Sequence, residues 1–393
     1  FPVKNIWQSI AAQLYWNYYQ QNRWKVLERT SVSNETTLDD LEQWDAKRFF
    51  DKVSMLYKES LSQPKALEKI DISIYDPILI KSVNTQQLRP TLYDLLAFRA
   101  LAYFENEEKD LNRPSFAFTL KDATVFSNAQ VFIKTTFATE DSSSLQHQAL
   151  QIYQTLLSIH KDDIQPEAFI DADLARLAFA YQYSTVANKK DAYLKALETI
   201  QHQYAAYPIS GIAAVKMANV LLERKYERHT RGSKTSTNHQ TQDAKTILEV
   251  VVQKFPKSEA SIQAQNLLQD IKRKELHITV EEVIIPNEPS KFLLQYKNVN
   301  QVFLKVIAIN NQENFWKGLQ KYSHNDEAIT SLLQAPVIKQ WSETLLGNED
   351  YELHRTEVKI DKLPVGMYVL MVSTDKQFRT ANNLLSHAMF QVS

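Results

Sequence analysis

Residues 259–280, EASIQAQNLLQDIKRKELHITV, contain the point at which the chain changes its structural period. Upstream, apolar residues recur three and four positions apart for more than two hundred residues, which is typical of amphipathic helices. From here on they alternate instead, at Leu276, Ile278 and Val280 and again in residues 291–298. The sequence therefore predicts a long helical region joined to one small β domain.

Composition narrows the class of protein. A chain of 393 residues is too long to fold around one hydrophobic core, so two or three domains are expected. Lys+Arg 45 against Asp+Glu 46 gives a net charge of −1, without the basic excess of a nucleic-acid-binding protein. No apolar run has the ~20 residues that a transmembrane helix needs, so we expect no membrane-spanning segment. Zero cysteines exclude disulfides, thiolate metal sites and a cysteine nucleophile.

Residues 1–144 are predicted to form an N-terminal helical domain. We expect a first helix from Ile6 to an end at Asn22, a second after Asp39-Asp40, and a third opened by Pro90. Residues 70–80 are expected to form an irregular segment lying in a groove, and residues 112–137 an extended, buried connection. Because the chain begins with Phe1 and shows no signal peptide, we interpret it as a processed or excised form.

Residues 145–275 contain a repeated pattern that predicts tetratricopeptide-like helical pairs. Three segments share an internal spacing of four residues: Ala149-Tyr153-Leu157, Ala196-Ile200-Tyr204 and Ala244-Leu248-Val252. The last two continue at an offset of 48, with Tyr207-Pro208 matching Phe255-Pro256 and Ser210 matching Ser258. Each aromatic–proline pair is expected to end a helix, and each serine to cap the next. The period is longer than the usual ~34 residues, so the units are irregular relatives of that repeat.

A polar, basic stretch at residues 224–241 interrupts the repeats. Its Ser, Thr, Asn and basic residues predict a solvated loop. The alternative is a basic contact site for an anionic partner or envelope polymer.

Residues 276–393 are predicted to form an antiparallel β-sandwich. Strand-like runs occupy residues 276–285, 291–298, 301–309, 351–360, 366–374 and 386–393. Turns are expected at Pro286-Asn287-Glu288-Pro289 and around Leu363-Pro364-Val365-Gly366. Residues 312–347, with Trp316, Leu319 and Trp341, are read as a long excursion of mixed spacing.

No catalytic, cofactor-binding or metal-ligating pattern is found, and we predict that the chain is not an enzyme. The five glycines form no phosphate-binding loop, and His147 and His160 are too far apart in sequence to ligate a metal from adjacent turns. The acidic pairs Asp39-Asp40 and Asp162-Asp163 are expected at helix starts or loops. Glu281-Glu282 interrupts a strand, so we expect one of the two to point inward or to mark a bulge.

The chain resembles the N-terminal region of the large bacterial alpha-2-macroglobulin-like proteins, in the form typical of the Bacteroidetes. The residues that carry the resemblance are Tyr15-Trp16-Asn17-Tyr18-Tyr19, Asn22-Arg23-Trp24, Arg29-Thr30, Trp44-Asp45, Arg89-Pro90-Thr91-Leu92-Tyr93-Asp94, Arg99-Ala100-Leu101, Leu363-Pro364, Gly366 and Tyr368. The aromatic block is the more specific part, since many sandwiches use a Leu-Pro-x-Gly-x-Tyr turn. The resemblance covers most of the chain and implies a helical module followed by the first macroglobulin domain.

In that family the full-length proteins act as endopeptidase inhibitors that close around a protease after it cuts a bait segment, and some carry a cysteine thioester. This chain has no Cys and one predicted sandwich, so neither bait nor thioester is expected in it. The resemblance implies a non-enzymatic scaffold in the periplasm, at the outer membrane or outside the cell. Its partners would be the other domains of the parent protein and, through them, endopeptidases or other envelope proteins.

A second hypothesis is a glycan- or peptide-binding helical-repeat protein of the outer membrane. It requires exposed rings in a concave surface, particularly among Trp7, Trp16, Trp24, Trp44 and Tyr93. The aromatic block also contains Arg23, Arg89 and Arg99, which we expect to form a buried ion pair more readily than a ligand site.

Overall fold

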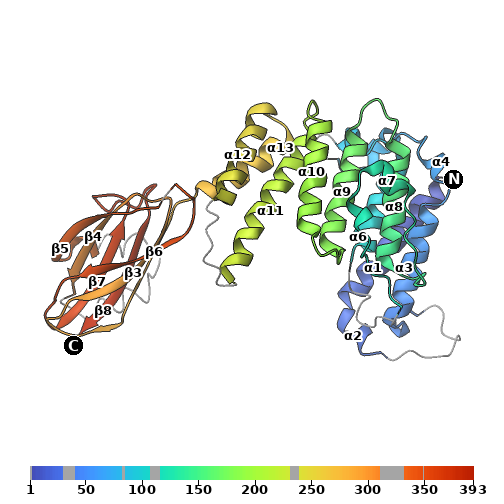
Figure 1. Ribbon diagram of the computed structural model, residues 1–393. Coiled ribbons are helices and arrows are strands. Elements are labelled where there is room, and N and C mark those ends of the chain that lie inside the picture. Colours follow the sequence, from blue (N-terminus) through green and yellow to red (C-terminus); the bar gives the residue numbers. More distant parts are fainter. Residues whose placement is uncertain are drawn as a thin grey trace. The chain divides into compact units, whose positions relative to one another are not determined.

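The computed structural model describes residues 2–29, 40–81, 85–106, 116–230, 239–309, 332–347 and 349–393. It is helical up to residue 272 and built of β-strands from residue 275 onward, which confirms the α plus β fold class (Figure 1). The chain divides into two compact units. The first holds residues 1–220 with 258–260, and the second holds residues 221–257 with 261–393.

The helices are α1 (Val3–Gln21), α2 (Arg23–Leu27), α3 (Ala46–Ser60), α4 (Pro64–Leu67), α5 (Thr85–Leu88), α6 (Leu92–Phe104), α7 (Ala129–Lys134), α8 (Leu145–His160), α9 (Glu167–Tyr183), α10 (Lys189–Gln203), α11 (Ser210–Thr230), α12 (His239–Lys254) and α13 (Glu259–Lys272). Short 3-10 turns are η1 (Leu41–Gln43), η2 (Ile72–Ile78) and η4 (Ala123–Phe126). The strands are β1 (Glu275–Val280), β2 (Val283–Ile284), β3 (Ser290–Lys297), β4 (Gln301–Ala308), β5 (Val337–Thr344), β6 (His354–Ile360), β7 (Gly366–Ser373) and β8 (Leu385–Val392).

The first helices begin and end near the predicted signals. Helix α1 stops at Asn22, whose side chain donates to the carbonyl oxygen of Tyr18. The start predicted after Asp39-Asp40 is displaced: Asp39 lies outside the described residues, Asp40 caps η1, and Asp45 caps α3. Thr91, the residue after Pro90, caps α6 in a reciprocal capping box with Asp94.

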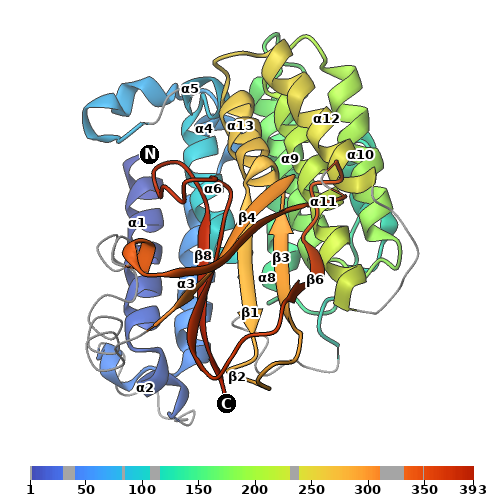
Figure 2. The same cartoon turned by 90° about the vertical axis from the view of Figure 1, so that its left-hand side faces the viewer.

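One apolar core runs through the first unit, from Ala12 to Val220. Helix α1 packs against α3 and α6, and Figure 2 shows α1 and α3 running side by side. The core therefore continues across the predicted 144/145 boundary, and the division into residues 1–144, 145–275 and 276–393 stays a prediction.

Two irregular segments differ from expectation. Residues 70–80 are partly buried: Ile72 is buried in η2 and Ile70, Tyr75 and Leu79 pack against the core, whereas Ile74, Ile78 and Ile80 are exposed. Residues 112–115 lie outside the described residues, and the rest of 112–137 is not simply extended because it contains η4 and α7. The sequence did not predict these short helices because the apolar residues here show no helical period. Asp122 caps the start of η4 and Asn128 caps the start of α7.

The repeats correspond to the helix pairs α8/α9, α10/α11 and α12/α13. Ala149, Tyr153 and Leu157 are buried on α8, as are Ala244 and Leu248 on α12. The predicted loop at 224–241 is shorter than expected, because α11 extends to Thr230 and α12 begins at His239. The middle of that loop, residues 231–238, lies outside the described residues, so the alternative basic contact site at 224–241 stays a prediction.

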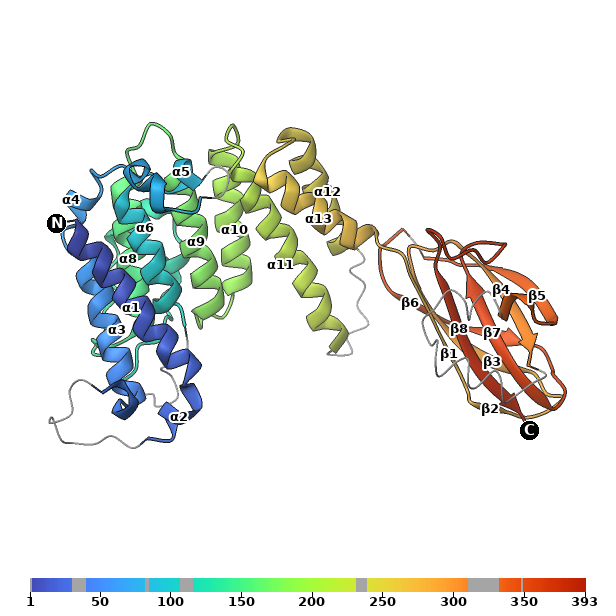
Figure 3. The ribbon, with the colours of Figure 1, turned by 180° about the vertical axis from the view of Figure 1, so that it is seen from behind.

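The strands form two sheets, with orders β1-β3-β6 and β2-β8-β7-β4-β5 (Figure 3). All pairs are antiparallel except β2 with β8, which is parallel, so the larger sheet is mixed. The predicted strand 276–285 is broken after Val280, where the chain leaves the first sheet and enters the second. Glu281 and Glu282 lie at this break with both side chains exposed, so neither points inward, and the register of β1 with β3 shows no bulge before it.

The excursion predicted at 312–347 contains a strand that the sequence did not indicate. Residues 312–331, including Trp316 and Leu319, lie outside the described residues, but β5 pairs with β4 along its whole length. Its inward positions are Lys339, Trp341 and Glu343, so the apolar alternation of a half-buried strand is missing.

One apolar core is shared by residues of both sheets, including Leu294 and Val358 from one and Leu304 and Leu370 from the other. Near it, the Tyr368 hydroxyl donates to the carbonyl oxygen of Pro364 at 3.0 Å. This bond ties the predicted Leu-Pro-x-Gly-x-Tyr turn to the start of β7.

Candidate functional site

The aromatic residues proposed for a ligand surface are divided between the core and the solvent. Trp16, Trp44 and Tyr93 are buried, whereas Trp7 and Trp24 are 64% and 76% exposed. Trp44 stacks on Tyr15 with ring centroids 5.3 Å apart. The five rings therefore do not form a shared stacking surface, because three of them pack inside the protein.

Of the three arginines of the aromatic block, Arg89 forms an ion pair with Asp171, and the two facing atoms are buried although both side chains are partly exposed. The Nε of Arg99 donates to the hydroxyl of Ser9 at 2.9 Å. The Nε of Arg89 lies 3.8 Å from Asp171 Oδ2 with both side chains partly exposed, and its guanidinium covers the ring of Phe98. Arg23 lies over the ring of Trp24.

A more deeply buried ion pair, which sequence reasoning missed, is formed by Arg176 and Asp173 on α9. Arg176 is fully buried and donates through Nε to Asp173 Oδ1 at 3.0 Å. Its Nη1 donates to the carbonyl oxygens of Val125 and Ser127, and its guanidinium lies 4.7 Å from the ring centroid of Phe132. Arg176 thus fastens the turn between η4 and α7 to α9. An Asp–Arg spacing of three is usual on exposed helices, so the spacing of Asp173 and Arg176 does not indicate burial.

A cavity of about 710 Å³ lies beside this ion pair, between η4, α7, α9 and α10. Asp173 and Arg176 line it together with Phe169 and Tyr204, and Lys161 and Lys195 stand on its more exposed side. Burial and then the charge of Asp173 raise the pKa of Tyr204. The phenol therefore stays neutral and able to donate a hydrogen bond at neutral pH.

A second buried polar group links α6 to the end of α8. The Nε2 of His160 lies 2.8 Å from Asp94 Oδ1 and its Nδ1 lies 2.7 Å from Asp163 Oδ2. Both ring nitrogens face carboxylates, so both must donate, which requires the imidazolium form. Burial lowers the pKa of His160, but hydrogen bonds to Asp94 and Asp163 and their charges outweigh it, so the pKa is raised. His160 is thus buried, whereas the dispersed histidines of the sequence predict surface or capping residues.

A third charged group lies on α9 and α11. Burial raises the pKa of Asp171, opposed by the positive charges of Arg89 and Lys216. Burial also lowers the pKa of Lys216, opposed by Asp171. The negative charge of Asp171 on α9 therefore faces the positive charges of Lys216 on α11 and of Arg89.

Within the described residues, no three His, Asp or Glu side chains are grouped as metal ligands. None of the described helices combines the length and apolar character that crossing a membrane requires.

The buried polar groups of Arg176 and His160 bond to carboxylates and carbonyls of neighbouring elements, so they connect helices to one another.

In the second unit, side chains of the β domain hold the end of α13. The Nδ2 of Asn298 donates to the carbonyl oxygens of Ile271 at 2.8 Å and Arg273 at 2.9 Å. Lys297 Nζ donates to the carbonyl oxygen of Asp270 at 3.2 Å. The carbonyls of Ile271 and Arg273 lie at and just beyond the C-terminal end of α13, where a helix leaves its carbonyls without intrahelical donors, so the β3–β4 turn supplies a donor for them. The Asp270 carbonyl also accepts from the backbone N–H of Arg273 at 3.4 Å. Asn298 has a left-handed backbone, with φ of 54°, which Asn tolerates better than most residues.

A second tie joins α12 to the segment before β6. The Thr241 hydroxyl donates to Glu352 at 2.8 Å, and Lys245 lies over the ring of Tyr351. The last helix pair and the β domain are therefore connected by side chains at two separate places.

No family model matches this chain, and no curated protein matches it significantly.

Proposed function

We propose that this chain is a non-enzymatic scaffold and interaction module. The observation that carries the proposal is the pair of ties between α12–α13 and the β domain, formed by Asn298 and Thr241. A covalent linker alone leaves two domains free to move, whereas contacts that satisfy a helix end restrict their relative motion. Such a connection suits a chain whose task is to hold other domains in position.

We further propose that the parent is a bacterial alpha-2-macroglobulin-like envelope protein with a protease-trapping role. Support comes from the aromatic block and the Leu363-Pro364 turn. The rings of Trp16 and Trp44 pack in the core, and the hydroxyl of Tyr368 binds the turn, so these residues stabilise the fold of such a module. In this proposal the two sheets are the first macroglobulin sandwich and the helix pairs are a tetratricopeptide-like solenoid. The bait and any thioester belong to the rest of the parent.

The test is a protease assay on the parent and, separately, on this chain. Each is incubated with a panel of endopeptidases, and residual activity is read on a large protein substrate and on a small chromogenic one. A trap blocks the large substrate and spares the small one, and the chain alone blocks neither. A parent that leaves both activities intact would refute the trapping role.

The scaffold role has its own test. In the parent, Asn298→Ala removes the tie to α13, while Asn300→Ala removes an exposed neighbouring side chain that makes no such bond. We expect Asn298→Ala to reduce trapping more than Asn300→Ala at unchanged expression. Equal trapping by the two variants contradicts a positioning role for this connection.

A second candidate is a peptide- or glycan-binding helical protein, which is favoured by the cavity beside Arg176. Phe169 and Tyr204 supply ring surface there, and Lys161, Lys195 and Asp173 supply polar groups. Titration with a mixture of short soluble oligosaccharides or peptides, read by intrinsic fluorescence, tests it. A response abolished by Tyr204→Ala and retained by Tyr207→Ala would move the proposal to this candidate.

A further inference from the structure

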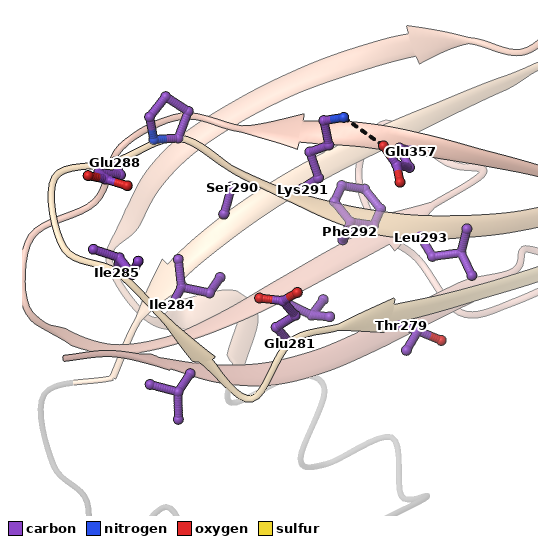
Figure 4. Close-up of a pocket in the computed structure, with 13 residues that line it drawn as sticks. Thr279, Glu281, Ile284, Ile285, Glu288, Ser290, Lys291, Phe292, Leu293 and Glu357 are labelled. Atoms are coloured by element: carbon purple, nitrogen blue, oxygen red, sulfur yellow. Dashed lines mark hydrogen bonds and ion pairs between the residues drawn. The ribbon is translucent and has the colours of Figure 1, made fainter.

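A second cavity opens where the chain changes sheets in the β domain. Its volume is about 510 Å³, and it lies between the segment that includes β2 and the segment that leads into β3 (Figure 4). Ile284 and Glu281 come from the first segment, and Ser290 and Phe292 from the second. The cavity exists because β1 leaves β3 at Val280 and the chain then crosses to β8.

Two strand edges border this cavity without a neighbour. The pairing of β3 with β1 ends at Phe292, whereas its pairing with β6 continues to Ser290. The stretch Ser290–Lys291 therefore has a strand on one side only. On the opposite wall, β2 is the last strand of its sheet in the described part of the chain, and it pairs with β8 alone. Unpaired edges present backbone donors and acceptors to an incoming strand.

The cavity is apolar at its centre and has exposed aliphatic side chains at its border. Ile284 and Phe292 are buried, while Val283 and Ile285 are 59% and 63% exposed. Branched aliphatic side chains at an unpaired edge offer alternate positions for the apolar residues of an added strand.

The charges around the cavity are acidic. Lys291 is paired with Glu357 at 2.7 Å, so these two neutralise each other. Glu281 and Glu288 also line the cavity, and no ion pair joins either to another described residue. The net charge of the lining is therefore negative and complementary to basic residues.

We propose that this cavity binds an extended segment of a partner protein in which basic and apolar residues alternate. The segment adds as a strand between β2 and the free end of β3. Its apolar side chains enter beside Ile284 and Phe292, and its basic side chains pair with Glu281 and Glu288. The proposal does not depend on the scaffold function or on the identity of the parent.

The test uses fluorescence anisotropy of the whole chain with a fluorescein-labelled, capped peptide KVKIKV. We expect saturable binding, about tenfold weaker binding of the acidic peptide EVEIEV, and loss of binding when the Val and Ile nitrogens of KVKIKV are methylated. Backbone methylation removes strand hydrogen bonds and leaves the charges unchanged, so it separates strand addition from electrostatic adsorption.

The matched variants are Glu281→Lys/Glu288→Lys and, as a control with the same charge change, Glu42→Lys/Glu140→Lys at exposed sites of the helical unit. We expect the first to weaken KVKIKV binding about tenfold and the second to leave it within about twofold. No binding of KVKIKV, equal effects of the two variants, or binding that survives methylation would each overturn the proposal. The methylated peptide tests the wild-type chain, so this result stands even if the first variant does not fold.

Discussion

The helical unit buries charged side chains among its helices, namely those of Asp94, His160, Asp173 and Arg176. In the described part of residues 275–393, by contrast, the buried polar side chain is that of Ser373. The β domain has ion pairs at the surface, such as Lys291–Glu357 and Lys339–Asp361. A sheet satisfies its own backbone through neighbouring strands, so its core needs apolar side chains alone. Helix ends and 3-10 turns leave backbone groups unsatisfied, and the helical unit uses buried side chains to satisfy them. The stability of the helical unit should therefore depend on charge and pH, and that of the β domain on packing.

The largest effect is expected from Arg176→Met. It leaves Asp173 buried without its partner and the carbonyls of Val125 and Ser127 without their donor, so we expect a loss of about 3–5 kcal/mol in the free energy of unfolding. Urea denaturation followed by circular dichroism measures it. The control is Arg273→Met, which breaks a pair with Asp270 whose two side chains are both exposed and should cost less than about 1 kcal/mol. Similar losses in the two variants would remove the distinction between buried and exposed charge.

A comparable loss in the β domain should come from packing. Leu370 is fully buried in the core shared by both sheets, so Leu370→Ala should cost about 2–5 kcal/mol. The control is Val365→Ala at an exposed turn position, which should cost little. Urea midpoints measured at several pH values check both statements. A Leu370→Ala loss that varies strongly with pH would contradict a purely apolar core.

His160 makes the stability of the helical unit depend on pH in a defined direction. The folded state raises its pKa above the ordinary 6.5, so it favours the protonated ring. The stabilisation is complete below pH 6.5 and is lost as the pH rises through the higher folded-state pKa. Unfolding free energies from pH 5 to 9 should therefore fall toward the alkaline end, and His160→Gln should flatten this slope and cost about 1–3 kcal/mol at the acidic end. His202→Gln, at an exposed site, is the control. An unchanged slope in His160→Gln would assign the pH dependence to other groups.

The smallest effect is expected from Arg99→Ala. This arginine donates one charged hydrogen bond to Ser9 from a partly buried position, so we expect a loss of about 1 kcal/mol and a small fall in melting temperature. Ser9→Ala should give a similar fall, and the double variant should lose less than the sum. A melting temperature equal to that of the wild type would show that this bond adds nothing.

The sequence predicted the division into helices and strands because burial imposes a period on both. The helix start near Pro90 and the helix end at Asn22 were predicted from local signals, whereas the capping box of Thr91 and Asp94 was not. Strand β5 was missed because Lys339 and Glu343 occupy inward positions, and the break between β1 and β2 was missed because alternation does not specify the sheet in which a strand pairs.

The candidate sites were less predictable than the fold. Arg176 contacts carbonyls about fifty positions earlier in the chain, and the Asp94–His160 contact joins residues 66 positions apart. Without an alignment or a motif, no local pattern marks such pairs. The cavity at the sheet change is likewise formed by the paths of three strands rather than by the residue types that line it.

The side chain of Asn298 has a consequence for how the protein is made. On the ribosome the end of α13 emerges before the turn that completes it, since Asn298 follows Ile271 by 27 positions. Until that turn has formed, the carbonyls of Ile271 and Arg273 lack the side-chain donor of Asn298, and the end of a helix without such donors frays. The complete end of α13 therefore requires the chain to extend at least to Asn298.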